Sequence, residues 1–121
     1  MRSNLKAVFI GKFQPPHLGH VMTAKRLLRK YNSIIIAVTD GKPNVMPPNE
    51  VLALFKEVLG VEKVEYRHVP GAVDEGSAVF DFEFDVICSG NLVVLELLKN
   101  KGFNVEFVER TKDSYFTGTS I

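Results

Sequence analysis

This sequence of 121 residues has only one cysteine, no tryptophan and a net charge of only +1. Cys88 has no partner for an internal disulfide, so the composition does not indicate an oxidised, secreted setting, and we interpret it as a small core residue. The 15 basic and 14 acidic residues argue against a charged surface for DNA, RNA or an anionic membrane. They are compatible with a small anionic ligand.

Long apolar runs are missing as well. No segment reaches the ~18 consecutive apolar residues of a membrane span. The first four residues lead into a strand-length run and do not resemble a signal peptide. We therefore predict a cytoplasmic protein with no membrane partner and no nucleic-acid partner. Apolar residues still make up 45% of the sequence, which is enough for one continuous core, so we predict a single domain over residues 1–121.

Short runs rich in β-branched and aromatic residues predict five strands, over residues 5–10, 33–38, 64–69, 85–90 and 104–108. The second run is apolar throughout, as in a strand that is covered on both faces. The third alternates between apolar and polar residues, which is typical of an edge strand with one wet face.

Apolar residues at helical spacing predict three helices, over residues 18–31, 50–59 and 92–101. Asn49 and Asn91 are the predicted N-caps of the second and third helices, and Gly60 and Gly102 are their predicted ends. The residues expected to face the core are Leu18, Val21, Met22, Leu27, Leu28 and Tyr31, then Val51, Leu52, Leu54, Phe55, Val58 and Leu59, then Leu92, Val93, Leu95, Leu97 and Leu98. Residues 70–84 are predicted as a short helix or an irregular segment, with Phe80, Phe82 and Phe84 in the core.

Strands that alternate with helices predict an α/β fold, a Rossmann-like, doubly wound and mainly parallel sheet with strand order 3-2-1-4-5. In such sheets ligands bind beyond the carboxyl ends of the strands at the switch point, here between the first and fourth strands. The loop after the first strand, the turn at residues 89–91 and the tail after the fifth strand would therefore converge on one crevice.

The loop after the first strand, residues 11–20, carries most of the chemistry. Pro15 and Pro16 stiffen it, and they place His17 and His20 in the first turn of the following helix. Backbone N–H groups and the positive end of the helix dipole lie there, and Lys12 adds a cation. Such a turn binds anions, and a phosphate is the expected ligand.

These ten residues, Gly-Lys-Phe-Gln-Pro-Pro-His-Leu-Gly-His, resemble the G-x-F-x-P-x-H-x-G-H signature of the nucleotidylyltransferase superfamily at every fixed position. The stretch is especially similar to G-R-F-Q-P-F-H-L-G-H of the archaeal-type nicotinamide mononucleotide adenylyltransferases, with Lys12 in place of arginine. Residues 89–91 are similar to their T-G-N turn, and residues 115–121 to their Y-S-G-T-E-I-R motif. Asn49-Glu50-Val51 stand where that family has G-E-R.

The resemblance implies an enzyme that transfers AMP from ATP to a phosphorylated small molecule such as nicotinamide mononucleotide, with release of pyrophosphate. It implies Mg²⁺ bound with the nucleotide and no metal site within the protein. The implied catalytic residues are His17, His20 and Lys12. The implied nucleotide-binding residues are Gly11, Phe13, Gly19, Gly90, Asn91, Thr117, Gly118 and Thr119. Asp40, Arg110 and Lys112 are the candidates for acceptor binding.

Several alternatives stay open. Compact cytidylyltransferases for polyol phosphates, which use CTP, place an R-T pair before their second motif, as Arg110-Thr111 does here. The sequence stops at Ile121 where the family continues with arginine, which favours a non-catalytic nucleotide-binding module as a further alternative. Scattered cations and carboxylates, Asp40 included, are typical of a solvated surface, and His68 is interpreted as structural. A homo-oligomer is also left open.

Overall fold

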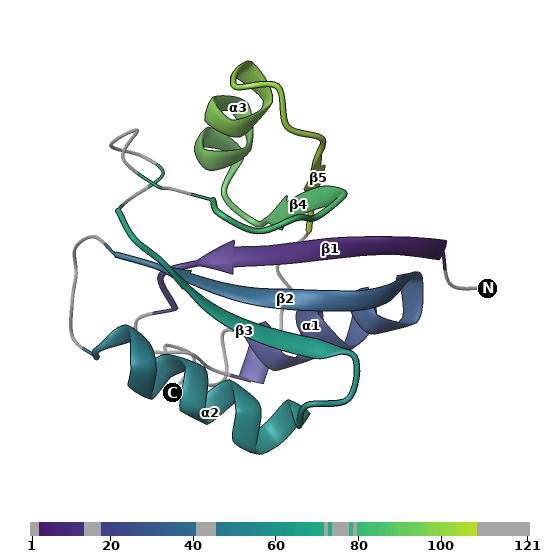
Figure 1. Ribbon diagram of the computed structural model, residues 1–121, viewed down its shortest axis with the longest axis vertical. Coiled ribbons are helices and arrows are strands. Elements are labelled where there is room, and N and C mark those ends of the chain that lie inside the picture. Colours follow the sequence, from purple (N-terminus) through teal and green to yellow (C-terminus); the bar gives the residue numbers. More distant parts are fainter. Residues whose placement is uncertain are drawn as a thin grey trace.

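Five parallel strands form one sheet at the centre of the computed structural model, which describes residues 3–13, 18–40, 46–71, 73, 78 and 80–108. The strands are β1 (Ser3–Gly11), β2 (Tyr31–Thr39), β3 (Val64–Val69), β4 (Val86–Ser89) and β5 (Val105–Phe107). Their order, β3-β2-β1-β4-β5, confirms the predicted topology (Figure 1).

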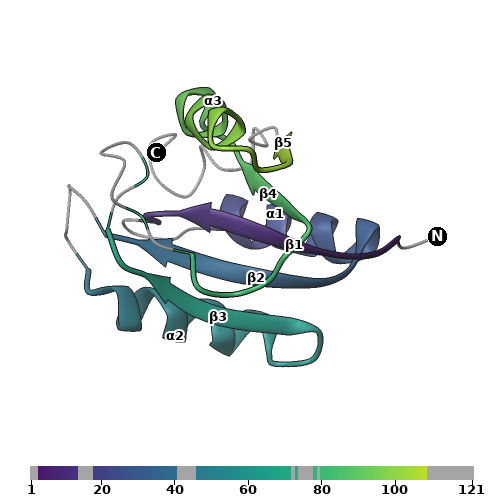
Figure 2. The same ribbon diagram turned by 45° about the horizontal axis from the view of Figure 1, so that its top comes forward.

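Helices cover both faces of this sheet. α1 (Leu18–Lys30) and α2 (Pro48–Leu59) lie on one face, and α3 (Leu92–Asn100) lies on the other (Figure 2). The core is accordingly divided into two clusters, one beneath α1 and α2 and one beneath α3. Within the described part of the chain, no helix has the length and apolarity needed to cross a membrane.

β2 lies between these layers, as its apolar sequence predicts. Residues 34–38 are at most 1% exposed, because their side chains alternate between the two clusters. Cys88 in β4 is fully buried, and this burial raises the pKa of its thiol to about 12. The interpretation of Cys88 as a core residue is confirmed.

The helix ends agree with the sequence at α3 and differ at α2. The Asn91 side chain caps α3 by accepting hydrogen bonds from the backbone N–H of Val93 at 2.9 Å and of Val94 at 3.4 Å. The predicted Asn49 cap is wrong, because α2 begins earlier, at Pro48, without a side-chain cap. Proline suits a first helical position, where the N–H that it lacks would have no helical partner.

The buried faces of α2 and α3 are narrower than their apolar spacing predicts. Leu54 and Val58 in α2 are 42% and 57% exposed, and Leu92 and Val93 in α3 are 66% and 62% exposed. α2 packs on β2 and the edge strand β3, and α3 packs on the short strands β4 and β5. An edge of a sheet covers only one stripe of a helix, so the expectation that these four residues face the core is wrong. Leu18 is also exposed.

Aromatic residues before β4 cover part of the face that α3 leaves open. Phe80, Phe82 and Phe84 lie outside any helix or strand, which confirms the irregular alternative for these residues. Their rings pack edge-on or tilted against one another and against Phe103, with centroids 5.5–6.1 Å apart. They contact the cluster beneath α3, and the guanidinium of Arg67 lies 5.2 Å from the ring centre of Phe82.

Glu106 joins β5 to the C-terminal end of α1. Its carboxylate accepts hydrogen bonds from the Tyr31 hydroxyl and from Lys30 Nζ, the latter at 2.8 Å. Burial by itself would raise the pKa of Glu106, but the hydrogen bonds from Lys30 and Tyr31 lower it below its usual value. Burial, together with the same hydrogen bond, raises the pKa of Tyr31, so its hydroxyl keeps the proton that it donates.

We expect Glu106→Gln to lower the free energy of unfolding at neutral pH by about 1 kcal/mol, because the amide still accepts from Tyr31 but loses its charge opposite Lys30. The pKa of Glu106 is lower in the folded chain than in the unfolded chain, where it is about 4.3. The wild type therefore has the higher free energy of unfolding at pH values above the pKa that Glu106 has in the unfolded chain. This difference is lost as the pH falls through the lower pKa that Glu106 has in the folded chain. Urea unfolding at neutral pH and near pH 3 measures this change. An equal difference at both pH values would contradict the role of the Glu106 charge.

Candidate functional site

The carboxyl ends of β1, β2 and β4 define the candidate site. In the sheet register Gly11 pairs with Val38 and Phe9 pairs with Cys88, so the segments after these three strands leave from the same edge. The loop after β1 and the turn after β4 therefore start from the same edge of the sheet, and their convergence on one crevice stays a prediction. The tail after β5 lies outside the described residues.

Phe13 folds back beneath the end of β1. Its backbone has a φ of +49°, which is rare for a residue with a side chain, and its ring is only 6% exposed. The ring packs edge-on against Phe9 and Phe55, with centroids 5.1 and 4.9 Å away. A Cβ on Gly11 would lie 2.9 Å from Cζ of Phe13, so only glycine leaves room for this ring. The side chain of Phe13 is thus a core element, and its role as a nucleotide-binding residue stays a prediction.

His20 lies in the first turn of α1, where it meets the same aromatic cluster. Its half-buried ring stands edge-on to Phe13, with centroids 4.8 Å apart, and 6.5 Å from the ring of Phe55. The cluster fixes one side of the imidazole and therefore its orientation. The contact with Phe55, a residue of α2, could not be read from the motif.

The first turn of α1 has the charge pattern of an anion site. It contains no acidic residue, while the last turn carries Arg29 and Lys30, so the positive end of the dipole near His20 is not neutralised by its own helix. Gly19 is buried there, and its carbonyl oxygen accepts a hydrogen bond from Thr23 Oγ1 at 3.0 Å. Lys12, half-buried, lies between β1 and this turn in the sequence.

The turn between β4 and α3 is held by its own side chains. Ser89 is buried, and its Oγ accepts a hydrogen bond from the backbone N–H of Asn91 at 3.1 Å. Because the Asn91 side-chain oxygen caps α3, this residue fixes the path of Gly90 at the edge of the sheet. A role for Gly90 and Asn91 near the base stays a prediction.

Asp40, an acceptor-binding candidate, directly follows β2 and has both carboxylate oxygens engaged. Oδ1 lies 2.7 Å from Nε2 of His68, and Oδ2 accepts from the backbone N–H of Gly71 at 2.9 Å. The hydrogen bond with His68, followed by the one from Gly71, holds the pKa of Asp40 below its usual value. Sequence reasoning missed the Asp40–His68 pair, although strand order placed both residues near the ends of neighbouring strands.

Six other candidates, namely His17, Arg110, Lys112, Thr117, Gly118 and Thr119, lie outside the described residues. The structure brings Gly11, Lys12, Phe13, Gly19 and His20 together through β1 and α1, and it places Gly90 and Asn91 after the neighbouring strand β4. Within the described ranges, no group of three or more histidine, cysteine, aspartate or glutamate residues could hold a metal ion.

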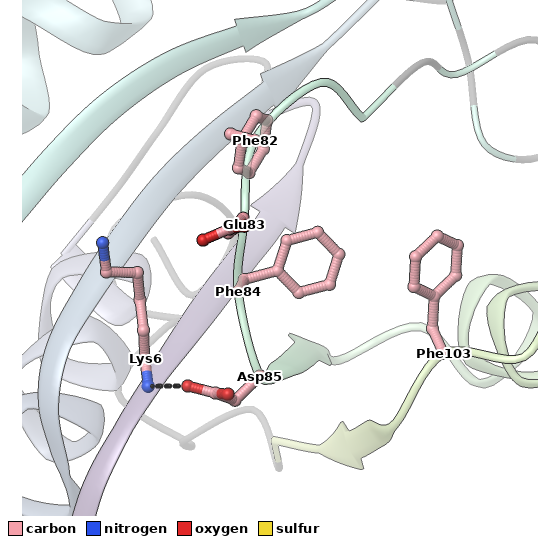
Figure 3. Close-up of a pocket in the computed structure, with 6 residues that line it drawn as sticks. All are labelled: Lys6, Phe82, Glu83, Phe84, Asp85 and Phe103. Carbon is pink, nitrogen blue, oxygen red and sulfur yellow. Dashed lines mark hydrogen bonds between the residues drawn. The ribbon is translucent and has the colours of Figure 1, made fainter.

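A groove elsewhere on the molecule is separate from this edge. It has a volume of about 530 Å³ and is lined by Lys6, Phe82, Glu83, Phe84, Asp85 and Phe103 (Figure 3). Asp85 directly precedes β4, and Lys6 lies in the first half of β1. The groove is therefore at the amino side of the strands, opposite the end where Gly11, Asp40 and Gly90 lie.

Known proteins resemble this chain over most of its length. Residues 8–76 match the family model described as cytidylyltransferase-like. The nicotinamide-nucleotide adenylyltransferase 1 of Sulfolobus acidocaldarius is 33% identical over 132 residues, which cover 97% of this chain and 75% of that protein. The phosphopantetheine adenylyltransferase of Geotalea daltonii is 36% identical over 95 residues, which cover 65% of this chain and 59% of that protein.

A solved structure shares the fold. The bifunctional NMN adenylyltransferase/ADP ribose pyrophosphatase from Francisella tularensis matches 91% of this chain with a TM-score of 0.69 and 16% sequence identity. This chain spans 39% of that longer protein. The family model covers more than half of the chain, and the Sulfolobus relative covers nearly all of it. Both confirm the resemblance that the motif indicates, and the chain belongs to the cytidylyltransferase-like family.

Proposed function

We propose that the chain is an adenylyltransferase that transfers AMP from ATP to a phosphorylated small molecule of the nicotinamide mononucleotide type. The observation that carries this proposal is the match of 97% of the chain to a nicotinamide-nucleotide adenylyltransferase at 33% identity. The geometry of Phe13, Gly11 and His20 supports it, because it orients an imidazole in the first turn of α1, at the positive end of the helix dipole.

The reaction requires positioning and charge stabilisation. A phosphate oxygen of the acceptor attacks the α-phosphorus of ATP, the bond to the oxygen bridging to the β-phosphorus breaks, and pyrophosphate leaves with the electron pair. His20 donates a hydrogen bond to an α-phosphate oxygen as negative charge accumulates there, and Lys12 and His17 contact the phosphates. The aromatic cluster holds the His20 ring before substrate arrives, which lowers the cost of reorganisation.

Mg²⁺ fits this site as part of the nucleotide substrate. It is a hard cation that phosphate oxygens bind well, and it offsets charge on the leaving pyrophosphate. Asp40, a carboxylate at the described edge, already uses one oxygen for His68 and the other for Gly71. These contacts support an ion held by the nucleotide and not by a protein cage.

An acceptor screen tests the proposal. Purified protein is incubated with ATP or CTP and one of nicotinamide mononucleotide, 4′-phosphopantetheine or glycerol 3-phosphate, and pyrophosphate release is measured. We expect ATP with nicotinamide mononucleotide to exceed each other pair in kcat/KM by at least about 100-fold, because polar pockets reject substrates that leave their groups unpaired. Mass spectrometry identifies the dinucleotide product.

The other outcomes of the screen are equally specific. Preference for 4′-phosphopantetheine would favour the activity in the name of the Geotalea relative, and preference for CTP with glycerol 3-phosphate would favour the cytidylyltransferase alternative. Nucleotide binding without pyrophosphate release from any pair would contradict the proposed function and favour a non-catalytic module.

A further inference from the structure

Asp40, His68 and Gly71 form a polar cluster, here called the Asp40 cluster, that joins the carboxyl ends of β2 and β3. Besides its two carboxylate contacts, Asp40 donates its backbone N–H to the carbonyl oxygen of Gly71 at 2.9 Å. Gly71 has a φ of +88°, which favours glycine, and this turn brings both backbone groups of Gly71 to Asp40. The cluster thus continues the pairing of the two strands beyond their last ladder pair, Thr39 with Val69.

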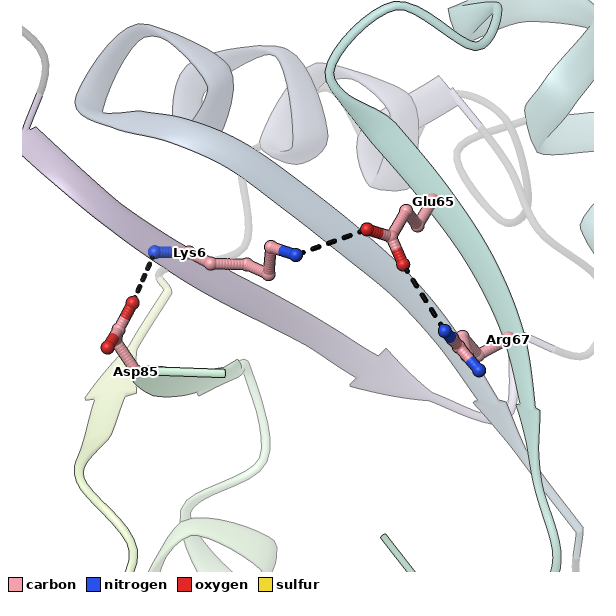
Figure 4. A network of polar contacts seen from close by, with 4 residues as sticks. All are labelled: Lys6, Glu65, Arg67 and Asp85. Carbon is pink, nitrogen blue, oxygen red and sulfur yellow. Dashed lines mark hydrogen bonds and ion pairs between the residues drawn. The ribbon is translucent and has the colours of Figure 1, made fainter. Parts of the chain in front are cut away.

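Stability alone does not account for the Asp40 cluster. The side chains of His68 and Asp40 are 39% and 45% exposed, and ion pairs with such exposure contribute little to the free energy of unfolding. β3, the strand that contains His68, also takes part in a second exposed ion-pair network. In that network Glu65 pairs with Lys6 at 3.1 Å and with Arg67 at 3.5 Å (Figure 4). That network is tied to Asp85, before β4, through Lys6, whereas the Asp40 cluster lies at the carboxyl ends.

The position of the cluster relates it to the second substrate. Asp40 lies two residues beyond Val38, the partner of Gly11, so it stands beside the start of the loop after β1. Strand order puts β2 and β3 on one side of β1, and β4 with Gly90 and Asn91 on the other. An in-line transfer brings the attacking and leaving oxygens to opposite sides of phosphorus. If the nucleotide binds on the side of β1 where β4 lies, the acceptor has to approach from the opposite side, where β2 lies.

We propose that Asp40 is a positioning residue for the acceptor, acting through His68 and Gly71 to fix the part of the site formed by the ends of β2 and β3. This inference rests on the proposed adenylyl transfer. In this proposal Asp40 acts by holding His68 and Gly71, one with each carboxylate oxygen, and not by binding the acceptor itself. By holding His68 and Gly71, Asp40 fixes the distance between the carboxyl ends of β2 and β3. This distance in turn determines how the acceptor is placed relative to the N-terminal end of α1.

Steady-state kinetics of Asp40→Ala test this inference. We expect the KM for nicotinamide mononucleotide to rise about tenfold or more, because a misplaced binding surface weakens productive binding. The KM for ATP and kcat should change less than about threefold, because the α1 end and the β4 turn are untouched. Asp40→Asn keeps an acceptor for Gly71 and should recover part of the loss. His68→Ala should raise the same KM, and the double variant should add little to either single variant.

Glu65→Ala is the matched control, because it removes a similarly exposed ion pair from β3 near the other end of the sheet. It should leave both KM values unchanged. Provided that the wild type is active, two results would overturn the positioning role of Asp40. One is an unchanged KM for nicotinamide mononucleotide in Asp40→Ala, and the other is an equal rise of this KM in Glu65→Ala. Absence of turnover by the wild type with every acceptor would overturn the proposed function, and this inference with it.

Discussion

The His20→Ala substitution is expected to lower kcat by about 100- to 1,000-fold, which is the usual cost of removing one hydrogen-bond donor that acts on transition-state charge. The proposed contact forms mainly as charge accumulates on the α-phosphate, so the KM for ATP should change little. Steady-state pyrophosphate release at saturating nicotinamide mononucleotide measures both parameters. Far-ultraviolet circular dichroism and a thermal melt establish that the variant is folded.

Two further variants separate the chemistry of His20 from its place in the helix. Lys25→Ala removes a cation from the exposed face of α1 and should leave kcat within about twofold, because the interactions of a solvent-exposed charge are weakened by water and salt. His20→Gln retains a donor and should recover part of the activity. Equal turnover in His20→Ala and the wild type would contradict the proposed role of the imidazole.

The topology and the central motif could be predicted because they depend on local patterns. The apolar run over residues 33–38 predicted a strand buried on both faces, and β2 contains that run. Asn91 and Gly60 were predicted correctly as helix boundaries, since both act through their own backbone neighbourhood. Such features need only a few consecutive residues to be recognised.

Features that depend on distant parts of the chain could not be predicted in the same way. The pairing of Asp40 with His68 depends on the register of β2 against β3, and the contact of His20 with Phe55 depends on where α2 packs. The exposure of Leu92 and Val93 follows from the short strands beneath α3. A single sequence contains these residues but not the register that brings them together.

The structure also shows that part of the signature serves packing. Gly11 and Phe13 are fixed positions of the motif, but one makes room for a ring and the other supplies it. His20 is then oriented by that ring at the end of α1. The site is consequently sensitive to a buried residue that need not touch the substrate with its side chain.

We expect Phe13→Ala to lower the free energy of unfolding by about 3–5 kcal/mol, the usual cost of removing a buried phenylalanine ring. Its edge-on contacts with Phe9, Phe55 and His20 are lost together, and each aromatic pair adds about 0.5–1.5 kcal/mol beyond area burial. Since small domains are stable by about 5–15 kcal/mol, this variant would stay marginally folded or unfold. Urea unfolding followed by circular dichroism measures the change.

A milder pair of variants distinguishes positioning of His20 from lost stability. Phe13→Leu and Phe9→Leu each replace a ring of the same cluster, and each should cost about 1–2 kcal/mol. Phe13 contacts His20 directly, whereas Phe9 packs on Phe13, so we expect Phe13→Leu to lower kcat by about tenfold and Phe9→Leu to change it little, because misplacing a catalytic group by a fraction of an ångström slows the reaction. Equal kcat values for the two leucine variants would show that Phe13 acts through stability alone. A drop confined to Phe13→Leu requires that the aromatic cluster sets the orientation of the catalytic imidazole.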